Sequence, residues 1–203
     1  LGLGYDVLKE INPRLIYVAN SGYGRSPGPL KGRVAYDIGI QARSGMLSVI
    51  GEEDGPPLFP KIGFADLGAP WVTATATLMA LEARHKTGKG QYIDQAMYDT
   101  MVAMFAERLP VLYSIAGIVD GRGPEKLYVP WGCYPTKDGY VGIVIIGDVR
   151  MWERLCKTIG REDLFEPYKT DQARVQNREL IRSAIIDWMK DKTSDCLLYT
   201  SPS

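Results

Sequence analysis

Two aspartates are the residues of this sequence best placed to perform chemistry. Asp66 ends a short apolar segment, KIGFAD, directly before a predicted helix. The start of a helix stabilises a negative charge because its first backbone N–H groups have no partner within the helix. From spacing alone, Asp66 is either the N-terminal cap of that helix or a carboxylate available for reaction. Asp37, which follows Tyr36 and a glycine-rich loop, could likewise be a cap.

Histidine and cysteine offer little alternative chemistry. The sequence has one histidine, His85, which sits between basic neighbours at a predicted helix end and is expected to cap that end. A Ser-His-Asp or Cys-His arrangement is therefore not favoured, and an imidazole metal site needs more than one histidine. The sequence has three cysteines, Cys133, Cys156 and Cys196, and they show no C-x-x-C spacing. We therefore predict neither a disulfide framework nor a metal site, and we expect the protein to be in the reducing cytoplasm.

Charge and hydropathy point to small-molecule chemistry. The 203 residues carry 24 basic and 24 acidic side chains, and this balance gives no field of one sign to attract nucleic acid or an anionic membrane. The longest apolar run, YVGIVIIG over residues 140–147, is much shorter than the roughly 20 residues that span a bilayer. We therefore expect neither nucleic acid nor a membrane as a partner.

The loop over residues 21–33 is the first element that could position a ligand. It reads SGYGRSPGPLKGR and follows an apolar run, LIYVA over 15–19, that is typical of a buried parallel strand. Ligands of open α/β sheets bind at the carboxyl ends of such strands. Gly22-x-Gly24 resembles half of a dinucleotide fingerprint, but the later glycine spacing and two prolines disfavour nicotinamide binding.

The remaining patterns predict an α/β chain in two parts. Helical spacing predicts helices over 4–10, 35–47, 70–85, 96–116, 151–159 and 177–190, with a strand at 91–94 and a hairpin joining 133–135 to 140–146. We divide the chain into a large domain over 1–116, a linker over 117–130 and a small domain over 131–192. Residues 193–203 continue no periodicity and are interpreted as a non-native or read-through tail outside the fold. The opening residues suggest that an upstream part is missing.

Several segments together resemble the class III CoA-transferase family, which includes formyl-CoA transferase and carnitine CoA-transferase. The matching segments run in family order from Leu1 to about Lys190: LGLGYDVLKEINPRLIYVANSGYG, AYDIGIQARSG, DGPPLFPKIGFADLGA, LEARHKTGKGQYIDQAMYD, YPTKDGYVGIVIIGD and WERLC. The loop reads GYGRSPGP where the family commonly has a Gln-Thr-Gly-Pro type of turn, so the resemblance does not predict the conformation around Arg25 and Ser26.

The resemblance implies a fold, partners and a set of site residues. The fold would be a Rossmann-like large CoA-binding domain, truncated at its N-terminus, with part of a smaller α+β domain, in chains that interlock as a homodimer. The substrates would be an acyl-CoA and a carboxylic acid, with no metal and no tightly bound cofactor. Asp66 carries over as the catalytic nucleophile, and the residues that carry over as acyl-CoA-binding are Arg33, Ala35, Tyr36, Asp37 and Ile38. The adenine and pyrophosphate contacts would lie before Leu1.

Carboxylate chemistry is consistent with that role of Asp66. A carboxylate can attack an acyl-CoA thioester and form a covalent aspartyl intermediate, from which CoA passes to an acceptor acid. Two alternatives stay open. The related α-methylacyl-CoA racemases share the fold and use a histidine for proton transfer, and that histidine falls on Tyr36, a poor base at neutral pH. The third possibility is a non-catalytic acyl-CoA-binding protein.

Overall fold

The chain folds into two compact units. The computed structural model describes residues 2–104, 121–123 and 128–200. The first unit is formed by Leu1–Gly51 and Gly55–Gly121, and the second by Glu52–Asp54 and Arg122–Ser203. The predicted linker over 117–130 lies in large part outside the described residues.

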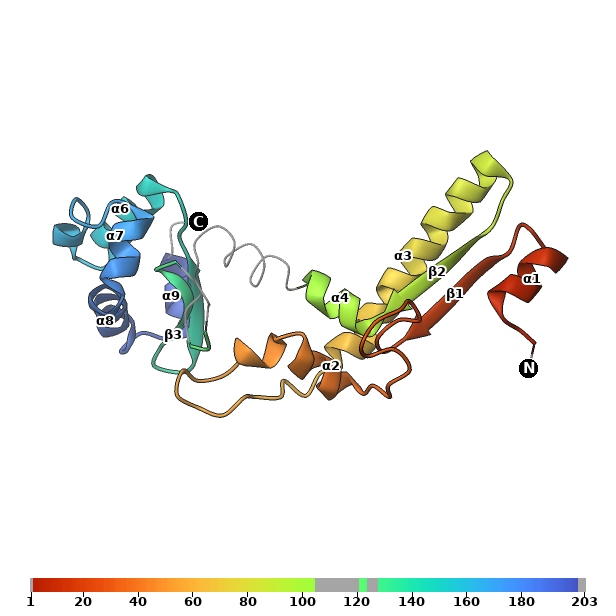
Figure 1. Ribbon diagram of the computed structural model, residues 1–203. Helices are drawn as coiled ribbons and strands as arrows, with labels where there is room; N and C mark the ends of the chain where they lie inside the picture. Colours follow the sequence, from red (N-terminus) through yellow and green to blue (C-terminus); the bar gives the residue numbers. More distant parts are fainter. Residues whose placement is uncertain (1, 105–120, 124–127, 201–203) are drawn as a thin grey trace. The chain divides into compact units, whose positions relative to one another are not determined.

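A two-stranded parallel sheet is the scaffold of the first unit. Helix α1 (Tyr5–Ile11) leads into β1 (Ile16–Ser21), which pairs with β2 (Gln91–Ala96) in the register Ile16↔Gln91 to Ser21↔Ala96. Parallel strands need a long crossover connection, and α3 (Phe64–Thr87) provides its main helix. Figure 1 shows α3 lying along both strands. The predicted strands and the helix over 4–10 are confirmed.

The start of α3 differs from the prediction. The pattern led us to begin this helix at Pro70, since proline suits a first helical turn, whereas α3 begins at Phe64 and includes Pro70. Proline has no N–H, so the carbonyl of Asp66, four residues earlier, receives no helical hydrogen bond from it. The predicted end is confirmed, because Gly88 adopts φ +70° and its N–H donates to the carbonyl of Arg84 at 2.8 Å.

Two shorter helices complete the described part of this unit. Helix α2 (Asp37–Arg43) ends four residues before the predicted limit, because Gly45 turns the chain at φ +87° into a 3-10 turn over Met46–Ser48. Helix α4 (Met97–Met104) follows β2 directly, and the rest of the helix predicted over 96–116 lies outside the described residues. These helices and the start of α3 enclose a core formed by Ile40, Met46, Ala65 and Met101.

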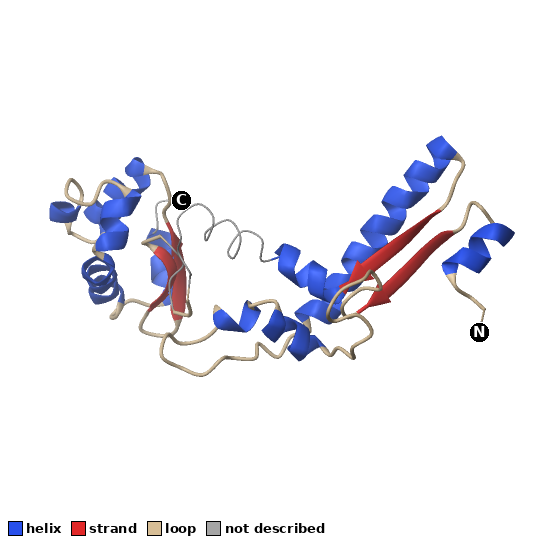
Figure 2. Cartoon of the chain, in the orientation of Figure 1, coloured by secondary structure: helices blue, strands red, loops and turns tan. Residues whose placement is uncertain are grey.

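The second unit is a hairpin packed against helices. Strands β3 (Trp131–Pro135) and β4 (Tyr140–Val144) are antiparallel, as predicted. The helical elements that follow are α6 (Val149–Thr158), a 3-10 turn (Glu162–Leu164), α7 (Asp171–Gln176), α8 (Arg178–Met189) and α9 (Ser194–Thr200). Figure 2 shows the strands of both units in red and their helices in blue.

Arg174 is the polar centre of the second unit. Its side chain is 1% exposed, donates to the carbonyls of Val129, Tyr168 and Lys169 and pairs with Asp171. Burial lowers the pKa of its guanidinium from the ordinary value. Four acceptors compensate for that burial, so the unit is held together by a buried charge as well as by apolar packing.

The segment interpreted as a tail is also helical. Residues of α9 pack on this unit, with Leu197 in its buried core. The mixed α/β class is thus confirmed, and the Rossmann-like arrangement stays a prediction. None of the helices within the described ranges has the length and hydropathy to span a bilayer.

Candidate active site

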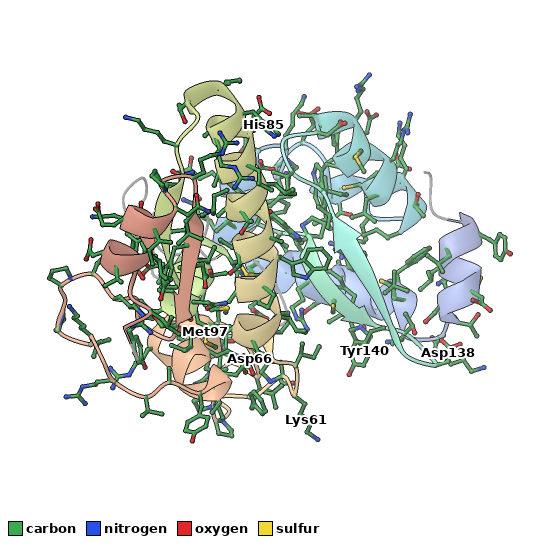
Figure 3. All side chains as sticks on the ribbon, turned by 90° about the vertical axis from the view of Figure 1, so that its right-hand side faces the viewer. Lys61, Asp66, His85, Met97, Asp138 and Tyr140 are labelled. Atoms are coloured by element: carbon green, nitrogen blue, oxygen red, sulfur yellow. The ribbon has the colours of Figure 1, made fainter. Side chains whose placement is uncertain are left out.

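Asp66 lies in the first turn of α3 and is not its cap. The cap position is Gly63, which has no side chain, so the cap interpretation of Asp66 is wrong. Asp66 is exposed, and among the described residues no group donates a hydrogen bond to its carboxylate. The lone histidine lies in the last turn of the same helix, as predicted, about 28 Å away at 1.5 Å per residue. Figure 3 shows Asp66 and His85 at opposite ends of α3.

Asp37 caps α3 from a neighbouring helix. Its Oδ1 accepts the backbone N–H of Ala65 at 2.8 Å and that of Asp66 at 3.1 Å. These are the second and third N–H groups of the helix, which a cap residue's own side chain ordinarily satisfies. The cap role foreseen for Asp37 is therefore real, but it acts on α3 and not on α2, whose cap position is Tyr36.

Gln41 holds the other oxygen of Asp37. Its amide Nε2 donates to Asp37 Oδ2 and to the carbonyl of Ile62 at 2.9 Å, and the side chain is fully buried. One amide thus joins α2 to the residues that enter α3. Our sequence analysis missed Gln41, although its position four residues after Asp37 on a predicted helix places both side chains on one face.

The backbone before α3 is strained. Lys61 has φ +58°, the left-handed region that non-glycine residues rarely adopt. It directly precedes Ile62, whose carbonyl is held by Gln41. A Cβ on Gly63 would lie 3.4 Å from Cβ of Asp66 and 3.6 Å from Oδ1 of Asp37, so the approach to the helix is closely packed.

The other predicted binding residues surround the start of α2. Arg33, Tyr36 and Ile38 are exposed, with Tyr36 75% exposed and Ile38 49%. Ala35 is half-buried and packs against the core that contains Ala65. The structure therefore connects Asp37 directly to Asp66 and leaves two large apolar side chains of the same segment accessible to a ligand.

This arrangement places an exposed carboxylate at the start of a helix. The first turn of α3 provides a partial positive charge, and Asp37 already occupies its free N–H groups, so the Asp66 carboxylate stays available for reaction. Within the described residues, no three His, Cys, Asp or Glu side chains are grouped as metal ligands would be.

Comparisons with known proteins agree with the resemblance. The sequence model of CoA-transferase family III matches residues 1–200. Relatives include succinyl-CoA:mesaconate CoA-transferase of Haloarcula hispanica, which is 35% identical over 96% of this chain and 50% of the relative, and human succinyl-CoA:glutarate CoA-transferase, which is 30% identical over 98% and 46%.

A solved structure shows the same fold. A CaiB/BaiF family protein from Brucella suis superposes with a TM-score of 0.75 at 32% identity, over 98% of this chain and 53% of that protein. The chain spans about half the length of the curated relatives that it matches. On the match of the family's sequence model over residues 1–200, the chain belongs to CoA-transferase family III.

Proposed function

We propose that the full-length protein transfers CoA from an acyl-CoA donor to a carboxylic acid acceptor, with Asp66 as the covalent nucleophile. The observation that carries this proposal is the pairing of an exposed carboxylate with a helix start whose N–H groups are already satisfied by Asp37. Family membership supports the reaction class. Both relatives described above are named for succinyl-CoA, so we propose a succinyl-CoA donor and a dicarboxylic acid acceptor.

The reaction proceeds through acyl exchange on Asp66. The carboxylate attacks the thioester carbonyl, the C–S bond breaks, and a mixed anhydride and CoA thiolate form. The thiolate then attacks the aspartyl carbonyl of the anhydride, which releases the donor acid and leaves an aspartyl-CoA thioester. The acceptor carboxylate attacks the carbonyl of the aspartyl-CoA thioester and expels CoA thiolate, which forms a second mixed anhydride. The thiolate then attacks the acceptor carbonyl of this anhydride, so that the acceptor acyl-CoA forms and the carboxylate of Asp66 is released. One thioester replaces another, so no ATP is consumed.

The neighbouring residues have two kinds of role in this proposal. Asp37 and Gln41 position the first turn of α3, since their hydrogen bonds reach the backbone of Asp66 and of the residues before it. Tyr36 and Ile38, with Ala35 and Arg33 beside them, line the acyl-CoA. The interlocked homodimer implied by the resemblance stays part of the proposal.

Mass spectrometry of trapped intermediates tests the proposal. The full-length protein is incubated with succinyl-CoA and quenched with hydroxylamine, which converts an aspartyl thioester or anhydride to a hydroxamate. We expect the modification on the peptide that carries Asp66, and its loss in Asp66→Ala. Glu82→Gln, which removes an exposed carboxylate from the same helix, serves as the matched control.

Two outcomes would replace this proposal. Exchange of the α-proton of a branched acyl-CoA with solvent, without any adduct, would indicate the racemase reaction. Tight CoA binding with neither adduct nor exchange would indicate a binding protein.

A further inference from the structure

The glycine-rich loop after β1 is fastened by the carboxylate of one residue of β2, Asp94. Asp94 accepts the backbone N–H of Arg25 at 2.9 Å, and it accepts the backbone N–H and the hydroxyl of Ser26, both at 2.7 Å. The parallel register pairs Asp94 with Ala19, so the carboxylate lies beside the point where β1 runs into the loop. The turn whose conformation the sequence did not predict is therefore built around Asp94.

The loop conformation is adapted to this contact. Gly24 adopts φ +80°, and a Cβ there would lie 3.6 Å from Asp94 Oδ2. Two successive N–H groups then point at one anion, an arrangement that turns with a left-handed residue produce. A second attachment lies just before it, where the N–H of Tyr98 donates to the carbonyl of Gly22 at 3.0 Å.

The charge of Asp94 is stabilised by these donors. Burial acts to raise the pKa of its carboxyl, but hydrogen bonds from the Ser26 hydroxyl and from the N–H groups of Arg25 and Ser26 outweigh burial and hold the pKa below its ordinary value. Hydrogen bonds to a charged acceptor are shorter and stronger than those between neutral groups. The fastening is thus stronger than a neutral turn would provide.

The fastened segment packs on both halves of the proposed site. A Cβ on Gly22 would lie 2.1 Å from Cβ of Ala35, so Gly22 lies directly against the segment that opens α2. The ring of Tyr23 lies 6.0 Å from that of Tyr98, and both pack with Ala35 on the core that contains Ala65, the residue before the proposed nucleophile. The loop therefore packs against Ala35, two residues before Asp37, and on the core that contains Ala65, the residue before Asp66.

We propose that Asp94 is a positioning residue: it holds loop 21–33 in the conformation that presents Ala35 and Tyr36 to the acyl-CoA. The last step of this inference, the presentation of Ala35 and Tyr36 to the acyl-CoA, rests on the proposed function. Asp94 acts through the loop and does not touch the reacting atoms. Its first step, the fastening of the loop, is independent of any activity.

Limited trypsinolysis measures the fastening. The Arg25–Ser26 peptide bond is a trypsin site whose two flanking N–H groups are the ones held by Asp94. In the full-length protein, we expect Asp94→Ala to raise the rate of cleavage at this bond by on the order of tenfold or more, since opening of the loop loses its charged acceptor. Asp94→Asn keeps one acceptor oxygen, so its cleavage rate should lie between those of the wild type and Asp94→Ala. Glu82→Gln, which changes a surface charge on α3, is the control.

Affinity for CoA measures the consequence. We expect the Kd for CoA, and the KM for succinyl-CoA, to rise about tenfold in Asp94→Ala while kcat changes less, because the loop contributes to binding in both ground and transition states. Circular dichroism checks that each variant is folded. Ser26→Ala removes only the hydrogen bond from the Ser26 hydroxyl, and this milder variant replaces Asp94→Ala in the test if Asp94→Ala does not fold.

The outcomes separate this inference from the proposed function. Cleavage of folded Asp94→Ala at the wild-type rate would show that the carboxylate does not fasten the loop, and so would wild-type rates in both Asp94→Asn and Ser26→Ala where Asp94→Ala does not fold. Faster cleavage with unchanged affinity for CoA would overturn the link to the site. A wild-type protein without transferase activity would refute the proposed function, while cleavage and the Kd for CoA would still decide the role of Asp94.

Discussion

Removing the Asp37 carboxylate should release the first turn of α3. In Asp37→Ala, the N–H groups of Ala65 and Asp66 lose their acceptor, and the fully buried amide of Gln41 loses one of its two acceptors. Loss of a helix cap costs about 1–2 kcal/mol, and a buried polar group left without a partner costs about 1–3 kcal/mol. Water can reach the exposed Asp66 and hydrogen-bond to the freed N–H groups, which offsets part of this free-energy cost. We therefore expect a local destabilisation of about 2–4 kcal/mol.

Hydrogen exchange read by mass spectrometry is the appropriate assay. A peptide that covers the first turn of α3 reports the opening of that turn, whereas global unfolding averages over the unit. The expected destabilisation corresponds to exchange roughly 30-fold or more faster than in the wild-type chain, at 1.4 kcal/mol per factor of ten. The nucleophile role that we propose for Asp66 predicts that the same variant of the full-length protein also loses kcat for CoA transfer, because a misplaced nucleophile forfeits the benefit of orientation.

A graded series separates capping from a general loss of charge. Asp37→Asn keeps an acceptor for the helix N–H groups but presents its own N–H to Gln41, so its exchange rate should lie between wild type and Asp37→Ala. Asp6→Ala removes an exposed carboxylate paired with Lys9 on α1 and should change stability by less than about 0.5 kcal/mol. Exchange of the first turn in Asp37→Ala within twofold of wild type would refute the capping role.

Three further predictions concern the second unit and the backbone before α3. Arg174→Leu should lower the stability of the second unit by about 3–5 kcal/mol in urea unfolding, because four acceptors lose their buried donor; a change below 1 kcal/mol would contradict this. A maleimide at pH 8 should label the exposed Cys133 and spare the buried Cys156, whose pKa burial raises to about 11; equal labelling of both in the folded chain would be inconsistent with the core. Lys61→Val should destabilise the first unit by about 1–2 kcal/mol because a β-branched residue is strained at φ +58°, while Lys61→Gly should retain full stability; equal stability of the two variants would argue against this backbone conformation.

Local patterns predicted those elements whose signals lie within the element itself. The first parallel strand lies in a short run of apolar and β-branched residues, LIYVA, and the hairpin carries its Lys-Asp-Gly turn between its strands. The end of α3 was also visible, because Gly88 and three basic residues mark it locally. The start of α2 was placed within two residues, and its end was misplaced because Gly45 was not recognised as a break.

The start of α3 was missed because its signal is not local. Gly63 offers no cap side chain, and Pro70 imitates a first-turn residue, so the pattern pointed six residues too far along the chain. The real cap is Asp37, which lies 26 positions before Gly63 and reaches the helix only through tertiary structure. Gln41 and Asp94 were missed for the same reason, since their partners are backbone groups of other elements.

The remote cap is compatible with the proposed role of Asp66 as a nucleophile at this helix start. Asp37 satisfies the N–H groups of Ala65 and Asp66 from another helix, so α3 is capped although Gly63 has no side chain. The proposed nucleophile itself is therefore not needed as a cap, and its carboxylate is exposed. The same contact ties Asp66 to α2, whose first residues we propose to line the acyl-CoA, so that in this proposal the substrate contacts of Tyr36 and the position of Asp66 both depend on the Asp37 carboxylate.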